Sequence, residues 1–269
     1  MTTRRNRLDV ELVRRGLVAS REQAAAAIAQ GRVKVAGSTA TKAATAVDTA
    51  VALVLEQPAE GESYVSRGGH KLVAALDTFA VSVEGKRCLD AGVSTGGFTD
   101  VLLRRGAREV VAVDVGYGQL AWSVRTDPRV ILHERTNARA ITPAQIGGQV
   151  ELVVADLSFI SLTTVLPALI ACAETSADLV LLVKPQFEVG KERLGQGGVV
   201  RDPQLRAESV RTVARHAATL GWGTEGVVRS PLPGPAGNVE FLLWLRAGDS
   251  RLDPVALARE VGTADTVTS

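Results

Sequence analysis

The stretch LDAGVSTGGFTD (Leu89–Asp100) is the part of the chain that decides the expected fold. It continues an apolar strand pattern over Arg87–Asp90 and leads into a helical pattern over Phe98–Arg105. Glycine lets the backbone come close to a bound molecule, and the first turn of a helix offers unpaired N–H groups. In doubly wound α/β folds, this first turn between strand and helix holds a nucleotide-like cofactor.

The chain that follows, up to residue 246, alternates in the same way. Apolar segments predict strands at Arg87–Asp90, Val110–Asp114, Val130–Leu132, Leu152–Asp156, Leu179–Lys184, Gly226–Val228 and Val239–Arg246. Helical patterns lie between most of them, at Phe98–Arg105, Tyr117–Arg125, Leu162–Ala173 and Gln204–Leu220. Short apolar strands that alternate with helices predict an α/β domain with a parallel, doubly wound sheet and helices on both faces.

The composition is that of an ordinary globular protein. Of the 269 residues, 46% are hydrophobic and 22% are charged, which excludes a largely disordered chain, a collagen-like repeat and a disulfide scaffold. Cys88 and Cys172 stand beside apolar residues without metal-ligand spacing, so we expect two buried, reduced thiols. Trp122, Trp222 and Trp244 are expected in the core. The chain has neither a signal-peptide pattern nor an uncharged apolar segment of ~20 residues, which predicts a cytoplasmic protein without membrane insertion.

The net charge of +2 hides an uneven distribution of charges. Residues 1–45 contain nine Lys and Arg against three acids, residues 46–62 contain four acids and no base, and residues 63–269 are neutral. A run of basic residues can be no more than a solvated surface, but this density ahead of an α/β domain indicates an anionic partner. Contacts of this kind read phosphates and folded shape, so we expect RNA binding that weakens steeply with salt.

The first 56 residues have a pattern of their own. They predict two short helices, the second with a capping box formed by Ser20 and Gln23, followed by small strands that include a hairpin around Val33–Val35. The segment EQPAEGESY (Glu56–Tyr64) carries Pro, Gly and acids without a core pattern, which is typical of a linker. We therefore expect a small α+β domain (1–59), an interdomain linker (60–66) and the α/β domain (67–269).

The glycine spacing discriminates between cofactors. The pattern D-x-G-x-x-x-G-G, in place of the dinucleotide fingerprint G-x-G-x-x-G, disfavours NAD and FAD and favours S-adenosylmethionine. The second strand ends at Asp114, 22 residues after Gly92, where an acid can accept both ribose hydroxyls; the alternative is a tight turn beside a solvated acid. Asn137 could contact the base or form a turn. The candidate cofactor-binding residues are Asp90, Gly92, Ser94, Thr95, Gly96, Gly97, Phe98, Asp114, Asn137 and Asp156.

Two lysines and two acids stand where the chemistry is expected. Asp156 and Lys184 close the fourth and fifth strands, Glu240 precedes the last strand, and Lys71 opens the α/β domain. Each alone is consistent with a salt bridge or a surface charge, but together they suit the alkylation of a hydroxyl group. We assign Lys184 as the general base, Asp156 and Lys71 as residues that orient the hydroxyl, and Glu240 as a holder of a lysine or the ribose. The histidines lack metal-ligand spacing, and an activated methyl donor needs no metal ion.

These residues carry a resemblance to known families. The order Lys71, Asp156, Lys184, Glu240, with DAGVSTGGF between the first two, resembles the K-D-K-E tetrad of FtsJ-like ribose 2'-O-methyltransferases. The segment RLDVELVRRGLVASREQAAAAIAQGRVKVAG resembles the alpha-L RNA-binding motif of the S-four type of ribosomal protein. With SRGGHKL, DVGYGQLAW, ADLSFISL, VKPQFEVG and SPLPGPAGNVEF, the chain is similar to the TlyA family of rRNA methyltransferases, also called the haemolysin A family, from about residue 4 to residue 246.

The resemblance implies a Rossmann-like class I methyltransferase domain that methylates the 2'-hydroxyl of cytidine in 16S rRNA, 23S rRNA or both. It further implies ribosomal RNA and ribosomal subunits as partners and an effect on sensitivity to capreomycin- and viomycin-type antibiotics. We also expect a monomer and, because many target nucleotides lie inside RNA helices, extrusion of the target base. Ala19 and the turn Ala36-Gly37 depart from the family pattern. The implied RNA contacts are Arg4, Arg5, Arg7, Arg14, Arg15, Arg21, Arg32, Lys34, Lys42 and Arg67. The alternatives are a haemolysin acting on membranes and a non-catalytic RNA-binding protein.

Overall fold

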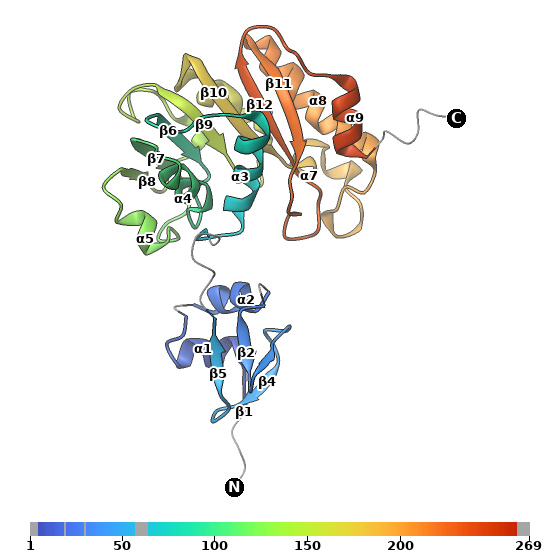
Figure 1. Cartoon of the computed structure of the whole chain (residues 1–269). Coiled ribbons are helices and arrows are strands. Elements are labelled where there is room, and N and C mark those ends of the chain that lie inside the picture. Colours follow the sequence, from blue (N-terminus) through green and yellow to red (C-terminus); the bar gives the residue numbers. More distant parts are fainter. Residues whose placement is uncertain (1–4, 19, 30, 57–63, 263–269) are drawn as a thin grey trace. The chain divides into compact units, whose positions relative to one another are not determined.

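The computed structural model describes residues 5–18, 20–29, 31–56 and 64–262, so Arg4 lies outside the described residues. The chain divides into two compact units, Met1–Ser63 and Tyr64–Ser269 (Figure 1). Tyr64 and Val65, which the sequence assigns to the linker, contact the second unit. Val65 N donates a hydrogen bond of 2.9 Å to Asp100 Oδ2, and Tyr64 packs against the apolar core.

The described part of the N-terminal unit is a small α+β fold, as predicted. Its elements are β1 (Arg5–Arg7), α1 (Leu8–Arg14), α2 (Arg21–Ala29), β2 (Val33–Val35), β3 (Ser38–Thr39), β4 (Ala46–Asp48) and β5 (Leu53–Leu55). β2 pairs with β3 in a hairpin and with β5, while β1 pairs with β4. The predicted helix cap at Ser20 is confirmed, because Gln23 N donates to Ser20 Oγ at 3.2 Å. Leu8, Leu12 and Val33 are fully buried in the core of this unit.

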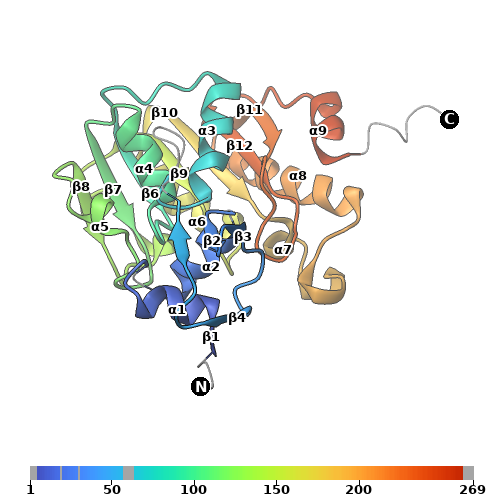
Figure 2. The ribbon, with the colours of Figure 1, turned by 60° about the horizontal axis from the view of Figure 1, so that its bottom comes forward.

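The second unit is built around a seven-stranded sheet with helices on both faces (Figure 1 and Figure 2). In chain order its helices and strands are α3 (Gly68–Phe79), β6 (Arg87–Ala91), α4 (Gly97–Arg104), β7 (Glu109–Val113), α5 (Trp122–Arg125), β8 (Val130–His133), β9 (Val150–Ala155), α6 (Leu162–Ala171), β10 (Ala173–Val183), α7 (Pro185–Glu188), α8 (Pro203–Thr219), β11 (Trp222–Arg229), β12 (Phe241–Ala247) and α9 (Pro254–Val261). The strand order is β11-β12-β10-β9-β6-β7-β8. The predicted Rossmann-like α/β class is therefore confirmed.

One strand departs from the predicted parallel sheet. β12 runs antiparallel to both of its neighbours, β10 and β11, whereas the pairs among β6, β7, β8, β9 and β10 are parallel. The cause is the connection: the loop 230–240 joins β11 to β12 without a helix, and so short a link allows an antiparallel pair only. The sequence also did not identify helix α3, and it predicted a longer helix than α5.

Side chains alternate between the two faces of the sheet and form two separate cores. Leu89 and Val111 belong to the core beneath α6 and α8, while Cys88 and Val110 belong to the core beneath α3 and α4. Cys88 is fully buried, as predicted, and burial raises the pKa of its thiol to about 12.

The second thiol and the tryptophans complete the comparison with the predicted core. Cys172 is fully buried and free, and burial raises its pKa to about 11. Trp222 is buried as predicted, but the prediction for Trp122 is wrong, since this side chain is 77% exposed at the start of α5.

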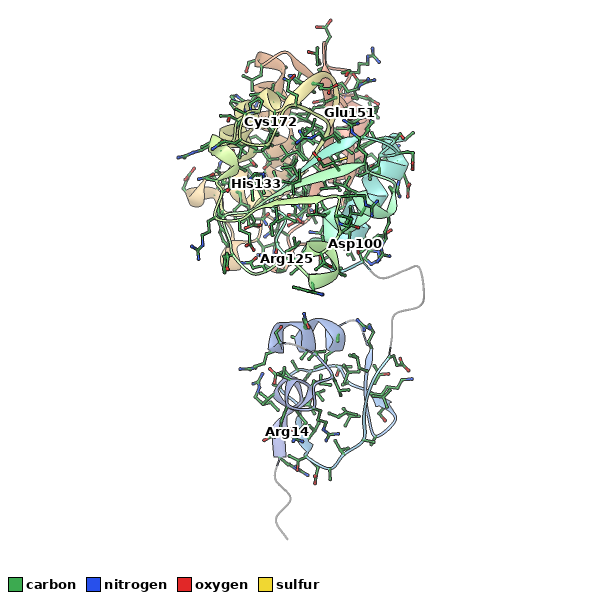
Figure 3. The ribbon with its side chains drawn as sticks, turned by 90° about the vertical axis from the view of Figure 1, so that its left-hand side faces the viewer. Arg14, Asp100, Arg125, His133, Glu151 and Cys172 are labelled. Atoms are coloured by element: carbon green, nitrogen blue, oxygen red, sulfur yellow. The ribbon has the colours of Figure 1, made fainter. Side chains whose placement is uncertain are left out.

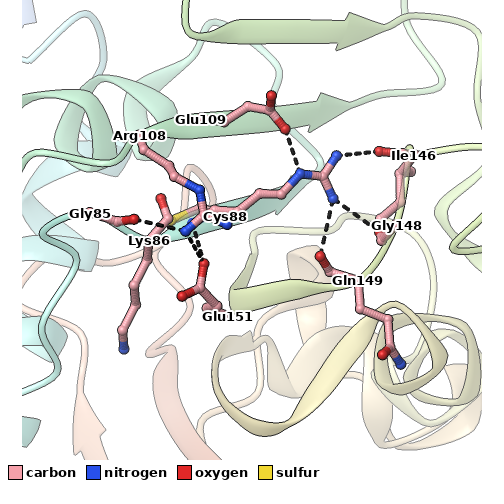
Figure 4. A network of polar contacts seen from close by, with 10 residues as sticks. Gly85, Lys86, Cys88, Arg108, Glu109, Ile146, Gly148, Gln149 and Glu151 are labelled. Atoms are coloured by element: carbon pink, nitrogen blue, oxygen red, sulfur yellow. Dashed lines mark hydrogen bonds and ion pairs between the residues drawn. The ribbon is translucent and has the colours of Figure 1, made fainter.

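The two ends of the parallel strands differ in character. Figure 3 shows Glu151 and Cys172 toward the amino ends of the strands, and Asp100 and Arg125 toward the carboxyl ends. At the amino edge a network of arginines and carboxylates joins the strands (Figure 4). Arg87 reaches Glu109 Oε1 at 2.5 Å and the carbonyl of Gly148 at 3.0 Å, and Arg108 pairs with Glu151.

Candidate active site

The carboxyl edge of the sheet brings the four predicted catalytic residues to one place. Asp156 follows the last residue of β9, and Lys184 follows the last residue of β10. Glu240 precedes the first residue of β12, and since Val183 pairs with Phe241, the continued register sets Glu240 opposite Lys184. Lys71 comes from the first turns of α3.

The four side chains form two ion pairs. Lys71 Nζ lies 2.6 Å from Glu240 Oε2, with side chains 9% and 0% exposed. Lys184 Nζ lies 2.6 Å from Asp156 Oδ1, with side chains 11% and 24% exposed. Removing the charges of two such pairs from water costs free energy that their mutual attraction does not fully repay. A contribution to folding stability therefore does not explain why both pairs lie at this edge.

Ser158 is a further member of this group that the sequence did not single out. Lys184 Nζ donates to Ser158 Oγ at 2.8 Å, and so contacts both Asp156 and the loop that follows it. Lys184 itself precedes Pro185, which begins α7 and fixes the direction of the chain after β10. The spacing of two residues between Asp156 and Ser158 was the available signal, but it is too common to interpret alone.

Glu240 lies beneath a loop that leaves no room for a side chain. A Cβ atom built on Gly234 would lie 2.5 Å from Glu240 Oε1, and Gly234 N donates to the carbonyl of Asn238 at 2.9 Å. Among the described residues, Glu240 Oε1 has no hydrogen-bond partner although it is buried. An acceptor of this kind is suited to a donor that arrives with a ligand.

The glycine-rich turn after β6 has the backbone geometry of a close-approach site. Gly92 has φ +89°, and a Cβ atom there would lie 2.6 Å from the carbonyl oxygen of Asp156. Ser94 and Gly96 also have positive φ, at 47° and 96°, and Gly96 lies at the N-terminus of α4. The turn therefore packs directly against the loop that carries Asp156, so the predicted cofactor-binding and catalytic residues are neighbours.

Asp114 organises the same turn from the next strand. Its Oδ2 accepts from Ser94 N at 2.7 Å, and its Oδ1 accepts from Gly116 N at 2.7 Å. Ser94 and Asp114 line a small pocket together with Val93, Gly116, Tyr117, Gln119, Leu120, Leu132 and Glu134. Glu134, which the sequence did not predict, accepts from Gly118 N at 2.7 Å and pairs with Arg125. This small pocket places two carboxylates, Asp114 and Glu134, beside apolar side chains.

Asp90 and Phe98 lie below the turn rather than on its surface. Asp90 is fully buried; its Oδ2 accepts from Thr99 Oγ1 at 2.6 Å, and its Oδ1 has no partner among the described residues. Burial raises the pKa of Asp90 to about 7, opposed by the Thr99 hydrogen bond and assisted by the negative charges of Asp156 and Asp114. The ring of Phe98 is packed in the core beneath α3 and α4.

The remaining predicted cofactor residues occupy structural positions. Asn137 uses its side-chain oxygen to accept from Arg139 N at 3.0 Å, which is the turn role that the sequence left open. The carbonyl of Thr95 accepts from Ala121 N at 3.2 Å and links the glycine turn to the start of α5. Gly97 is the first residue of α4, where Ser66 is so close that a Cβ atom would collide with its hydroxyl.

An exposed aromatic side chain lies on the loop that follows Asp156. Phe159 is 91% exposed and has φ +64°, which is a strained conformation for a bulky residue. Its ring centroid lies 5.3 Å from that of Phe187, and Lys184 Nζ lies 6.0 Å from the centroid of Phe187. Exposure and strain together make Phe159 a candidate functional side chain, and neither is visible in the sequence.

Many of the predicted RNA contacts in the N-terminal unit are paired within that unit. Glu11 is fully buried and holds Arg14 at 2.5 Å and Arg15 at 2.8 Å, and these arginines hold the pKa of Glu11 well below its usual range. Asp9 pairs with Arg7 at 3.0 Å and Arg21 at 2.9 Å.

Some of the other predicted RNA contacts form ion pairs or hydrogen bonds with neighbouring residues, and others are exposed to solvent. Lys34 pairs with Glu56, and Arg32 Nε donates to the carbonyl of Glu56 at 3.0 Å. Arg5, Lys42 and Arg67 are exposed. Several basic side chains of this unit are therefore held by its own acids, while Arg5 and Lys42 remain exposed.

We searched the part of the chain that the structure describes for a metal site and for a membrane-spanning helix. In these ranges, no group of three or more His, Cys, Asp and Glu could hold a metal ion. No helix in the same part of the chain combines the length and the apolar character needed to cross a membrane.

Comparison with known families identifies both units. Residues 64–247 match the FtsJ-like methyltransferase family, and residues 6–50 match the S4 domain. The FtsJ-like match covers more than half of the chain and includes all four residues of the two ion pairs.

Individual relatives agree with this result. The chain is 64% identical over 248 residues, 92% of either chain, to the Mycobacterium tuberculosis (strain ATCC 25618 / H37Rv) protein named 16S/23S rRNA (cytidine-2'-O)-methyltransferase TlyA. It is 38% identical over 184 residues, 68% of this chain and 71% of the relative, to the Campylobacter jejuni 23S rRNA (cytidine-2'-O)-methyltransferase TlyA. A solved structure from Streptococcus thermophilus, described as a candidate hemolysin, is 38% identical with a TM-score of 0.76 over 98% of this chain and 97% of that one.

Proposed function

This chain belongs to the TlyA branch of the FtsJ-like methyltransferase family, and we propose that it transfers a methyl group from S-adenosylmethionine to the ribose 2'-hydroxyl of cytidine in ribosomal RNA. The observation that carries the proposal is the juxtaposition of the Lys71–Glu240 and Lys184–Asp156 pairs with the glycine turn at one sheet edge. A hydroxyl acceptor needs a base, and this edge offers two lysines held by two acids.

The residues present fit S-adenosylmethionine, which supplies a methyl group already activated by its sulfonium. The pocket beside Ser94 and Asp114 suits the adenosine part, since each Asp114 oxygen accepts one backbone hydrogen bond and keeps a lone pair for a ribose hydroxyl. The N-terminus of α4, reached through Gly96, suits the carboxylate of the methionine part. Gly92 brings this turn into contact with the Asp156 carbonyl, next to the proposed base.

Lys184 is the residue that removes the proton from the 2'-hydroxyl while the oxygen forms its bond to the methyl carbon and the carbon–sulfur bond breaks. The ammonium group formed on Lys184 is then stabilised by Asp156 at 2.6 Å and Ser158 at 2.8 Å. These contacts favour the state reached in the reaction over the starting state, which is the condition for catalysis.

The second pair and the aromatic side chain position the nucleotide. Glu240 holds Lys71 and keeps a free buried oxygen, so the pair can orient the ribose hydroxyls without joining the proton transfer. Phe159 offers its exposed ring to an unstacked base, and stacking on an aromatic side chain is worth about 1–3 kcal/mol per base. A target cytidine inside an RNA helix would have to leave its stack to reach this ring.

The test is methyl transfer to rRNA from cells that lack this enzyme. We expect the purified chain with labelled S-adenosylmethionine to label this rRNA, and nucleoside digestion followed by mass spectrometry to give 2'-O-methylcytidine. rRNA from cells that contain the enzyme is the matched control, because its site is already modified and should take up little label. A methyl group on the base instead of the ribose, or equal labelling of both RNAs, would contradict the proposal.

A further inference from the structure

The edge strand β11 has an arginine at the end that lies on the catalytic edge of the sheet. β11 is parallel to β10, because both pair antiparallel with β12, so the carboxyl end of β11 lies at the same edge as Lys184. Arg229 is the last residue of β11 and pairs with Phe241, which pairs in turn with Val183. Neighbouring strands are about 4.8 Å apart, so the Arg229 backbone lies about 10 Å from that of β10.

Two more arginines lie at the start of α8. Arg201 is on the loop before this helix, and Arg206 is in its first turn, where its Nε donates to the carbonyl of Val200 at 3.0 Å. Asn238, which is 2% exposed, accepts from Val200 N at 2.9 Å and donates to the carbonyl of Gly198 at 3.0 Å. This asparagine ties the loop before α8 to the loop that covers Glu240, and so fixes the arginines relative to the site.

The charge of this group is not balanced locally. Among the described residues, no ion pair is found for Arg201, Arg206 or Arg229 at 4.0 Å or less. Burial and the neighbouring charge of Arg229 lower the pKa of Arg206, and only Asp202 acts against this. Asp202 Oδ1 already accepts from Gln204 N at 2.8 Å as the cap of α8.

The other arginines of this unit provide a contrast. Arg193 pairs with Glu208, Arg125 with Glu134 and Arg251 with Glu225. The carboxylate of Glu260 accepts from the Arg229 backbone N at 2.8 Å and pairs with the side chain of Arg259. Guanidinium groups left without carboxylates beside a reaction site are suited to an anion brought by the substrate.

We propose that Arg201, Arg206 and Arg229 form a phosphate-binding surface that holds the RNA backbone next to the nucleotide undergoing methylation. The inference rests on the proposed function, since it takes RNA as the substrate. The cofactor turn lies at the β6 and β7 end of the catalytic edge, so the RNA must approach over the β10, β12 and β11 end, where these arginines are. Planar guanidinium groups match phosphate oxygens in pairs, and such contacts fix register without reading sequence.

The test compares two double variants of the full chain that remove the same charge. Arg201→Ala/Arg229→Ala removes two of the proposed phosphate-binding groups and spares Arg206, whose bond to Val200 supports the loop. Arg246→Ala/Arg251→Ala removes two arginines that pair with Asp178 and Glu225 at the amino edge. The measurements are binding to ribosomal subunits from cells lacking the enzyme at several salt concentrations, and the KM for rRNA.

We expect Arg201→Ala/Arg229→Ala to raise the KM for RNA about tenfold and to reduce the log–log salt slope of binding by about 2, because each arginine neutralises one phosphate. Its affinity for S-adenosylmethionine should not change, and Arg246→Ala/Arg251→Ala should retain the wild-type values. An unchanged salt slope in Arg201→Ala/Arg229→Ala, or the same reduction in the amino-edge variant, would overturn the inference. If the wild type transfers no methyl group to rRNA, the proposed function fails, while the salt slopes still decide whether these arginines bind RNA.

Discussion

The two edges of the seven-stranded sheet are built from similar charged residues and use them in opposite ways. At the amino edge, Arg87 reaches Glu109 and three backbone carbonyls, and its own N–H donates to Glu151 at 2.9 Å. Lys86 pairs with Asp178 at 3.0 Å. At the carboxyl edge, Asp90 and Glu240 each keep a buried oxygen without a partner in the described structure.

We interpret this difference as one edge that is built for stability and one that is built for a ligand. A buried acceptor without a partner costs about 1–3 kcal/mol, so the carboxyl edge is the less stable of the two. The cost persists where a bound molecule supplies the missing donor or needs the charge. The comparison between the edges can be tested with pairs of matched variants.

The largest expected effect separates two lysines, each in an ion pair with an aspartate. Lys184→Ala should lower the kcat for rRNA methylation by about 10²–10⁴, the usual contribution of a general base. Lys86→Ala at the amino edge should leave kcat near the wild-type value, although it also loses an ion pair. Single-turnover methyl transfer measures both variants, and a Lys184→Ala enzyme with wild-type turnover would remove the base assignment.

Glu240→Gln tests the buried pair at the carboxyl edge. The substitution leaves the Lys71 ammonium buried without an opposite charge, and breaking a buried pair in this way costs about 3–5 kcal/mol of unfolding free energy. The double variant Lys71→Met/Glu240→Gln removes the buried cation as well and should recover most of that loss, while remaining inactive. Urea unfolding at pH 7 measures the stabilities, and a single variant as stable as the double variant would contradict this account.

The edges should also respond to pH with opposite signs. The Asp90 carboxyl has a pKa of about 7 in the folded chain and near 3.8 when unfolded, so between these values the folded state binds more protons. Its contribution to stability is therefore lost as the pH rises from about 4 to 7, by roughly 1–4 kcal/mol. At the amino edge, the Arg87 backbone N–H, followed by Arg108, lowers the pKa of Glu151, so that its contribution is lost as the pH falls.

Asp90→Asn and Glu151→Gln separate these two contributions. Asn keeps an acceptor for Thr99 but cannot ionise, so Asp90→Asn should flatten the decline in unfolding free energy between pH 4 and 7. Glu151→Gln should flatten the acid limb below the unfolded pKa and leave the neutral range unchanged. Urea unfolding at several pH values gives both profiles; a wild-type profile with no decline toward pH 7 would contradict the raised Asp90 pKa.

The sequence predicted which residues lie at the carboxyl edge of the sheet, but it did not predict the direction of β12 or the backbone conformation of Phe159. A run of apolar residues that ends in a charged one, such as LVVAD or LVLLVK, predicts where a strand ends. Asp156 and Lys184 could therefore be placed at one edge of the sheet before the strand pairing was known. The antiparallel β12 was missed because strand direction depends on a connection, and the positive φ of Phe159 was missed because nothing in the side chain requires it. The charge count at the N-terminus predicted a basic unit, but it could not show how the charges are paired, such as Glu11 buried between two arginines.

The smallest expected effect concerns backbone strain at the two edges. Phe159 in the catalytic loop and Ala80 at the end of α3, which leads to the amino edge, both have positive φ, at 64° and 53°. Glycine adopts this conformation without a Cβ penalty of about 1–2 kcal/mol, but it loses more entropy on folding. Ala80→Gly should therefore stabilise the chain by about 1 kcal/mol or less, and Phe159→Gly should be more stable than Phe159→Ala by a similar amount.

The two sites should differ in activity even though their strain is alike. Both Phe159 variants lose the ring and should show the same fall in kcat/KM for RNA, because stacking depends on the side chain and not on the backbone angle. Ala80→Gly should keep the wild-type kcat/KM. If Phe159→Gly retained full activity, the exposed ring would have no part in holding the nucleotide, and its strained backbone would be a local feature of the loop, as at Ala80.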